Sequence, residues 1–293
     1  METVSTALAL CTSDVISGNL NTWRIHLLGI HKLLLSALEH DSETFRNTDS
    51  IWSFLIKWFE TLDMFAGISG LRKSTVRRGQ YQSARRAGYI DEFVGCSLEL
   101  MPLLAKIGRL ARKQTKQIEY TYVTDNAGRE DSRTILADEI QSTEKQIYSL
   151  LGRKVHPSFA QNPMNMTLAK DMENTHQAFV YASLLHLYRR VEQLPKNHIK
   201  PAHAVYQIVD TLQRIRPDSV ANILTLWPVF TAGCETDDPI QRRIIQERMQ
   251  SMAAFGMGNV NSALQAMTAY WAAGSSERWD IFLDQKNHDI VLF

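Results

Sequence analysis

Residues 51–70 limit the possible folds of this chain more than any other segment, because they are apolar on almost every side of a helix. The segment reads IWSFLIKWFETLDMFAGISG and mixes tryptophan and phenylalanine with aliphatic side chains. A helix that is hydrophobic all round is stable when other elements surround it or when it lines a cavity. No apolar run in the chain approaches the roughly 20 residues that a membrane span needs. We therefore expect this helix to be buried among other helices or to line a cavity.

Helical periodicity extends over most of the remaining chain, while the alternating pattern of strands is almost absent. Residues 22–40, for example, repeat apolar side chains at steps of three and four. Further helices are expected over 92–122, 131–152, 167–194, 201–215, 219–231, 239–255, 261–273 and 275–283. We predict an all-α fold in which residues 1–293 form a single domain, an irregular array of about ten to eleven helices without a repeat of fixed period. A basic, glycine-containing surface loop is expected at about residues 70–89.

The net charge of +1 hides a strong local imbalance. Residues 71–117 carry eleven Lys and Arg against three Asp and Glu, a net of +8, so the rest of the chain sums to −7. A balanced total argues against a dedicated nucleic-acid binder, although a local basic surface remains possible. The basic run consists of Arg72, Lys73, Arg77, Arg78, Arg85 and Arg86. This run has three interpretations. It is a nuclear-import signal, an electrostatic contact with DNA beside a site that another domain recognises, or a solvated loop without a specific function.

A second group of cations, Arg109, Arg112, Lys113 and Lys116, lies at helical spacing and is expected to form one exposed helix face.

The three cysteines, Cys11, Cys96 and Cys234, lie far apart and are odd in number. Together with an N-terminus that lacks a basic n-region, this pattern indicates a reduced intracellular setting.

Motifs for catalysis and metal binding are missing or incomplete. No HExxH, CxxC or GxSxG is present, and the pairs His26/His31 and His198/His203 are spaced five apart, on different helix faces. Asp237-Asp238 lacks the third carboxylate of a DDxxD, and we read it as a helix cap before Pro239. Gly256-Met257-Gly258 has neither a third glycine nor a preceding strand. We expect no enzyme activity, no metal site and no cofactor.

Cys234 precedes Glu235, which leaves an activated thiol to be weighed against a structural role. We favour the structural reading, in which a helix ends at a left-handed Gly233 and Cys234 is buried beside it. The aromatic side chains are also open to two interpretations, a core or an interhelical ligand cavity. The residues that are candidates for lining such a cavity are Trp52, Trp58, Phe59, Trp227, Phe230 and Trp271.

Three segments, taken in order, resemble a known family. They are WRIHLLGI at 23–30, DEFVGCSLEL at 91–100 and LWPVFTAGCE at 226–235, the last followed by an acid-opened helix and by a helix ending on a tryptophan. This order resembles the fungal-specific transcription factor domain, the regulatory module of zinc binuclear cluster transcription factors. The signature positions are Trp23, His26, Gly29, Gly95, Trp227, Pro228, Gly233, Cys234 and Glu235, and the resemblance implies a structural role for them.

The resemblance implies a nuclear regulatory domain that restrains or exposes activation surfaces in RNA polymerase II transcription. Its implied partners are a small-molecule effector, the transcription machinery or co-regulators, and a second copy in a homodimer. The family's DNA reader is a zinc cluster of six cysteines, so zinc would belong to a segment that this sequence lacks, and we expect no sequence-specific DNA binding. The chain would then be a piece of a longer protein or a natural protein without the cluster. The alternative is a helical protein–protein interaction scaffold that binds no ligand.

Overall fold

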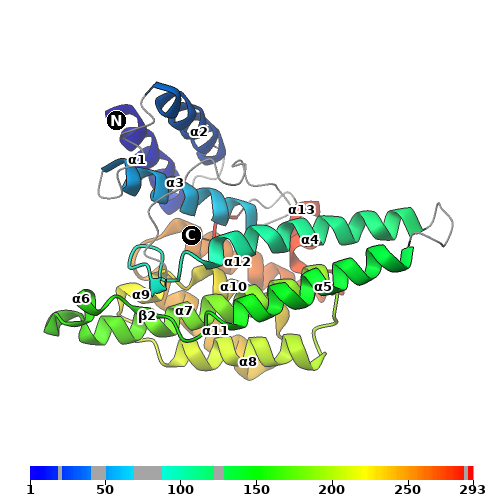
Figure 1. Cartoon of the computed structure of the whole chain (residues 1–293). Helices are drawn as coiled ribbons and strands as arrows, with labels where there is room; N and C mark the ends of the chain where they lie inside the picture. Colours follow the sequence, from blue (N-terminus) through cyan, green and yellow to red (C-terminus); the bar gives the residue numbers. More distant parts are fainter. Residues whose placement is uncertain (19–21, 41–50, 69–87, 122–128, 287–289, 293) are drawn as a thin grey trace. The chain divides into compact units, whose positions relative to one another are not determined.

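The computed structural model describes residues 1–18, 22–40, 51–68, 88–121, 129–286 and 290–292 (Figure 1). Of the residues that the structure describes, 76% are helical, and they form 13 α-helices, 11 of them with at least seven residues. The prediction of an irregular all-α array is confirmed. Most of the expected basic loop, including all six cations of the basic run, lies outside the described residues.

The chain divides into two compact units, one formed by residues 1–86 and 246–293 and the other by residues 87–245. The single domain expected from the sequence stays a prediction, and each unit is described separately. One helix, α11 (Pro239–Ala253), crosses the boundary between the two units.

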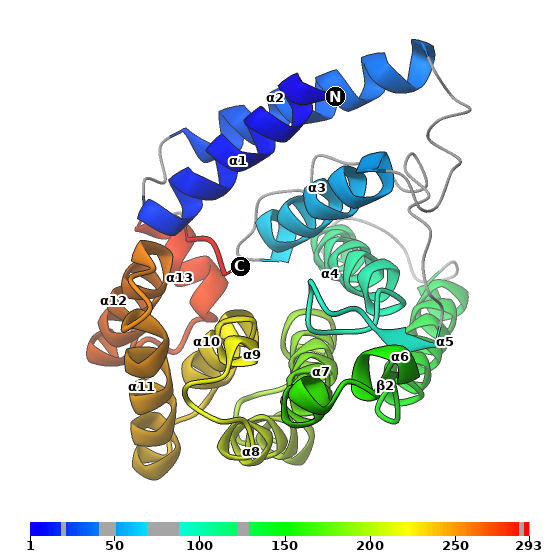
Figure 2. The same ribbon diagram turned by 90° about the vertical axis from the view of Figure 1, so that its left-hand side faces the viewer.

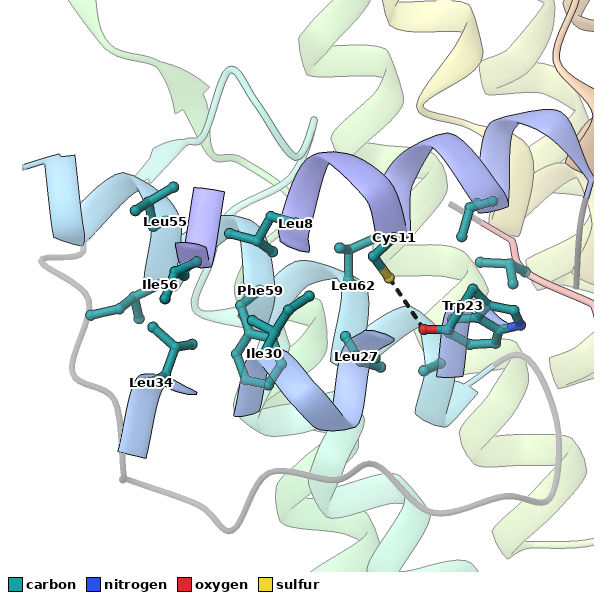
Figure 3. Close-up of a cluster of buried hydrophobic side chains, with 14 of the residues drawn as sticks. Leu8, Cys11, Trp23, Leu27, Ile30, Leu34, Leu55, Ile56, Phe59 and Leu62 are labelled. Atoms are coloured by element: carbon teal, nitrogen blue, oxygen red, sulfur yellow. Dashed lines mark hydrogen bonds between the residues drawn. The ribbon is translucent and has the colours of Figure 1, made fainter. Parts of the chain in front are cut away.

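The first unit consists of α1 (Glu2–Ser17), α2 (Trp23–His40), α3 (Ile51–Ile68), α12 (Gly258–Ala273) and α13 (Trp279–Gln285). Helix α1 packs against α2, α3 and α12, and α13 packs against α12. The apolar helix expected at 51–70 is α3, and it supplies Leu55, Ile56, Phe59 and Leu62 to a core shared with α1 and α2 (Figure 3). Burial against neighbouring helices therefore accounts for its apolar character.

The second unit is built around α7 (Met166–His186), which continues into a π-helical turn at Leu187–Val191. Figure 2 shows α7, α8 (Ile199–Gln213) and α10 (Leu226–Glu235) side by side. Two longer helices, α4 (Leu100–Thr121) and α5 (Arg129–Tyr148), pack against each other and against the α7 region. The short helices α6 (Pro157–Ala160) and α9 (Val220–Ile223), and a parallel pair of two-residue strands, β1 (Tyr89–Ile90) and β2 (Lys154–Val155), complete the unit.

Most expected helices differ from the structure by a few residues at their ends, and two differ by more. The helix expected at 92–122 begins only at Leu100, because residues 91–99 form a loop in which Gly95 has φ +80°. The helix expected at 219–231 is two helices, α9 and α10. The break precedes Pro228, whose ring would clash with the carbonyl of Leu224 in a continuous helix.

Candidate functional site

Helix α10 packs against α7 and α8 in the second unit, and all ten of its residues are buried. Trp227 contacts Phe179 and His186, at ring-centroid distances of 5.6 Å and 5.1 Å. Both neighbours belong to α7, so the indole fixes α10 against the C-terminal half of the central helix. The signature block 226–235 is thus an internal helix with no exposed residue.

The last residue of the block, Glu235, forms a buried ion pair with Arg189 of the π-helical turn. Arg189 Nε donates to Glu235 Oε2 at 2.6 Å, and the two side chains are 9% and 2% exposed. The Arg189 guanidinium also donates through Nη1 to the carbonyl oxygen of Leu194. Single π-helical turns within α-helices are frequent at functional sites. A buried pair of this kind adds little net stability, but removing one partner leaves an uncompensated charge.

The pair bears on the two readings of Cys234. Glu235 Oε2 accepts a hydrogen bond from Arg189 Nε and Cys234 is fully buried, which favours the structural reading. The predicted left-handed Gly233 is wrong, because α10 runs through Gly233 to Glu235. None of the three cysteines is in a disulfide. Burial, with Asp14 adding to it, raises the pKa of the Cys11 thiol to about 12, and burial also raises the pKa of Cys96, which keeps both unreactive.

The second signature segment forms the loop before α4. Asp91 Oδ1 accepts hydrogen bonds from the backbone N–H groups of Phe93 and Val94, at 3.0 Å and 3.2 Å, which starts the turn. At Gly95 a Cβ atom would lie 2.9 Å from Thr175 Cγ2, and the positive φ already favours glycine. Gly95 is therefore required both by the turn and by the close approach of the loop to α7.

His176 of α7 holds the same loop in place. Its Nδ1 accepts from the backbone N–H of Ser97 at 3.2 Å, so the proton is on Nε2, which donates to the carbonyl oxygen of Leu150 at 2.7 Å. Burial lowers the pKa of His176 and keeps the ring neutral. Ser97 Oγ donates to Glu99 Oε2 rather than to the imidazole. Ser97 and His176 are therefore not a nucleophile and its base.

A polar cluster that the sequence analysis missed links α5, the π-helical turn and α8. Tyr188 Oη donates to Glu144 Oε1 at 2.7 Å and lies 3.3 Å from Tyr148 Oη. Lys200 Nζ lies 3.2 Å from Glu144 Oε1, 3.4 Å from Glu192 Oε2 and 4.9 Å from the Tyr188 ring centroid. These residues are too widely spaced along the chain to form a local motif, so the sequence did not predict that they would come together.

Burial raises the pKa of Tyr188 and of Glu192 in this cluster. Burial alone would lower the pKa of Lys200, but the Glu144 and Glu192 carboxylates raise it overall. The ammonium group therefore stays charged and compensates the two acids. The cluster is a cross-link between three elements.

The first signature segment lies in the first unit, where Trp23 is fully buried. The Cys11 thiol donates to the Trp23 carbonyl oxygen at 3.4 Å (Figure 3). His26 Nε2 lies 3.3 Å from Asp14 Oδ2, which joins α2 to α1. A Cβ atom at Gly29 would meet nothing within 4 Å, so no packing in the described part of the chain requires this glycine.

The six candidate cavity-lining aromatics are divided between the units. Trp52 and Phe59 are buried in the α1–α2–α3 core, and Trp58 Nε1 donates to Thr12 Oγ1 at 3.1 Å. Trp271 is half-buried on α12. Trp227 and Phe230 are buried on α10 of the second unit. The ligand cavity itself stays a prediction.

Two polar atoms on one face of α10 are unusual for a packed interior. Trp227 Nε1 and Thr231 Oγ1 are buried, and neither has a hydrogen-bond partner among the described residues. Positions i and i+4 of a helix lie one above the other on one face. Leaving such a group unsatisfied costs about 1–3 kcal/mol. The α10 face beside α7 therefore presents an N–H donor and a hydroxyl group whose hydrogen bonds the packed core does not satisfy.

The remaining candidates behave as caps. Asp238 Oδ1 accepts from the backbone N–H groups of Ile240 and Gln241, at 2.7 Å and 3.4 Å, so the predicted cap of α11 is confirmed. Asp237 pairs with Arg242 at 2.7 Å.

In the parts of the chain that are described, no three His, Cys, Asp or Glu side chains gather to hold a metal ion. Within the same residues no helix is long and apolar enough to cross a membrane.

Comparison with known protein families identifies a family that matches this chain. A family described as the fungal specific transcription factor domain matches residues 1–293. The match spans both compact units and all three signature segments. No curated protein and no solved structure matches the chain.

Proposed function

The chain belongs to the family of fungal specific transcription factor domains, and from this membership we propose that it is an effector-responsive regulatory domain that controls transcription by RNA polymerase II in the nucleus. Residues 1–293 contain three cysteines, too few for a six-cysteine zinc cluster, so another domain or protein supplies the DNA reader. The domain acts without catalysis and without a resident cofactor. Its partners are a small-molecule effector, co-regulators and a second copy of the domain.

The observation that supports an effector is the pair of buried polar atoms on α10. A ligand that accepts a hydrogen bond from Trp227 Nε1 and bonds Thr231 Oγ1 would remove the cost of leaving both unsatisfied. The Phe179 ring, which contacts Trp227, supplies an apolar wall. This chemistry suits a small polar molecule with at least one acceptor oxygen or nitrogen and an apolar portion.

Such a ligand regulates by shifting a population of helix arrangements. It binds best to the arrangement in which α10 presents both polar atoms, and it moves the equilibrium by its differential affinity. A coupling of about 1–3 kcal/mol, roughly 5- to 150-fold, is typical of allosteric proteins. The Arg189–Glu235 pair joins α10 to the π-helical turn, so movement of α10 also moves the segment that leads to α8.

A reporter assay tests this function. Residues 1–293 are fused to an unrelated DNA-binding domain and assayed on rich and on metabolite-limited media. We expect activity that changes with the medium, and we expect Trp227→Phe, which keeps the ring but loses the N–H donor, to abolish the change. Trp58→Phe is the matched control, because its N–H already has a partner in the first unit.

The alternative function, a scaffold without ligand, is favoured by the outer face of α2. Ile25 and Leu28 are 69% and 44% exposed there, next to the open Gly29. If the fusion is nuclear and silent on every medium, regulation by an effector is contradicted. A scaffold would instead bind its partner equally on all media and lose it in an Ile25→Ser, Leu28→Ser double variant.

A further inference from the structure

Helix α4 carries a row of cations on the side opposite its buried residues. Its core positions are Leu104, Ile107 and Leu110, each 2% exposed. Lys106, Arg109, Arg112 and Lys113 follow the other side at steps of three and four, and Arg112 and Lys113 are exposed. We call these four side chains the α4 cationic face.

Among the residues that the structure describes, the α4 cationic face has more positive charge than neighbouring carboxylates neutralise. In the described part of the chain the ion pair that it makes is between Lys113 Nζ and Glu139 Oε2 of α5, at 2.7 Å. That hydrogen bond, together with the nearby charges of Lys113, Lys106 and Arg109, lowers the pKa of Glu139. Burial lowers the pKa of Arg109, and the like charge of Arg112 lowers it further. In the described part of the chain, Lys106, Arg109 and Lys113 act on this one carboxylate and Arg112 adds a fourth positive charge beside Arg109, so an incoming anion would relieve their repulsion.

The dimensions of the face match a nucleic-acid strand. From Lys106 to Lys113 the helix rises about 10 Å. One DNA strand presents a phosphate about every 3.4 Å along the duplex axis, so this length faces about three phosphates. Four cations and one carboxylate leave a net charge of three on the face, which is about the number of phosphates that it would meet.

The surface between the cations decides which kind of polyanion fits. Pro102 and Ala105 are exposed and Gly108 is half-buried on the same helix, and no large hydrophobic side chain of α4 is exposed among the described residues. Peptide partners gain most of their affinity from buried aromatic and aliphatic anchors, which need apolar pockets. A phosphate backbone binds by charge and counterion release alone.

We propose that the α4 cationic face binds the phosphate backbone of DNA without reading its sequence. The contact would lie beside the site that a separate DNA-binding domain recognises and would hold the regulatory domain against the duplex. It is independent of the effector, so the two proposals can fail separately.

Fluorescence anisotropy of a labelled 25-base-pair duplex of arbitrary sequence tests the proposal with the whole chain. We expect a Kd of about 1–100 μM, the range of non-specific binding at physiological salt. Three phosphate contacts give a slope near −2.7 in log K against log salt, or about 40-fold weaker binding at 200 mM than at 50 mM salt. A triple variant, Lys106→Gln, Arg109→Gln, Arg112→Gln, should lose at least tenfold in affinity and most of that slope.

A matched triple variant controls for net charge. Lys32→Gln, Lys170→Gln and Lys286→Gln remove three exposed lysines elsewhere, and this variant should lose less than threefold. Glu139→Gln removes the one carboxylate and should tighten binding, a gain that a folding defect cannot produce. Equal losses in the two triple variants, or no tightening in Glu139→Gln, would overturn the proposal. Binding of a labelled poly-glutamate peptide that depends on the face, without DNA binding, would assign it to an acidic protein instead.

Discussion

Arg189 and Glu235 are the clearest case in which single side chains hold segments of this protein together. They lie 46 positions apart in the chain, one on the π-helical turn and one at the end of α10, and both are buried. The attraction within such a pair roughly offsets the cost of removing two charges from water. The pair therefore specifies where α10 ends against the turn, and its energetic importance becomes visible when one partner is lost.

Arg189→Met should reduce the free energy of unfolding by about 3–5 kcal/mol, because it takes the Arg189 guanidinium away from the buried Glu235 carboxylate. The double variant Arg189→Met, Glu235→Met removes both charges and should recover most of the loss. Urea unfolding of the wild type, both single variants and the double variant measures the coupling. Additive effects of the two single changes would contradict a direct interaction.

His176 makes the stability of the second unit depend on pH. Its pKa in the folded protein is below the ordinary value of 6.5, because burial favours the neutral ring. Arg153 lowers the pKa further, while the Leu150 carbonyl and Glu99 act in the opposite direction. A lowered histidine pKa means that the unfolded chain binds a proton first as the pH falls. Stability from this group is thus complete above about pH 6.5 and is lost below it.

Between pH 7.5 and 5.5 the wild type should lose up to about 1.4 kcal/mol through this residue, since one pKa unit corresponds to 1.36 kcal/mol. His176→Gln keeps a donor and an acceptor but cannot titrate. Urea unfolding at the two pH values should therefore show a smaller pH dependence in the variant, whatever its stability at pH 7.5. Equal pH dependence in both proteins would assign the acid sensitivity to other groups.

At the level of elements, the close crossing of α1 and α12 depends on Gly258. A Cβ atom there would lie 2.6 Å from the carbonyl oxygen of Ser17, so Gly258→Ala requires the backbone of one helix to shift. Overpacking of this kind typically costs about 1–3 kcal/mol. Thermal unfolding should show a lower Tm for the variant. An unchanged Tm would mean that α1 and α12 separate without cost.

Gly29→Ala is the matched change in an open position of α2. Alanine is favoured over glycine inside a helix by about 0.8–1.0 kcal/mol, and no described atom opposes the new methyl group, so stability should rise. If the stabilised variant loses activity in the reporter fusion, the glycine of the signature serves a contact with a partner. A fall in stability would instead reveal a packing role.

The helices were largely predictable from the sequence because apolar spacing and caps are local signals. The apolar residues of α3 and the cap at Asp238 followed from such patterns. The loop before α4 was missed because its apolar residues occur at helical spacing, while the deciding contacts, from His176 and Thr175, come from α7. The extent of α10 was missed because Gly233 suggested an end, yet burial on every side holds the glycine in the helix.

The candidate site was less predictable, because it depends on pairs that are distant in sequence. Trp227 and Glu235 were recognised as signature positions, but their partners His186 and Arg189 carry no motif. The polar cluster around Tyr188 gave no signal at all. The expected role in transcription regulation came from resemblance to a family, whereas the residues alone predicted mainly the fold.

For the whole molecule, the path of the chain bears on how its two units respond to each other. Residues 1–86 and 246–293 form one unit, so the second unit is inserted within the first along the sequence. The chain returns to the first unit within α11, a continuous helix from Pro239 to Ala253. A helix that melts at one end loses neighbouring hydrogen bonds because helix formation is cooperative. Loss of either unit should therefore destabilise the other through α11.

The tryptophans allow this coupling to be measured. Trp227 is the sole tryptophan within residues 87–245, and the other five belong to the first unit. In a Trp227→Phe variant, fluorescence therefore reports on the first unit, while far-UV circular dichroism reports on the helices of both. If residues 1–293 unfold as the single domain that the sequence predicts, the two urea curves should coincide, because coincident transitions by different probes are a test of two-state behaviour. Insertion of Gly-Gly within α11, between Ile245 and Gln246, should separate them, since two glycines break the continuity of the helix. Separate curves in the variant without the insertion would mean that the units unfold independently and that α11 carries no coupling between them.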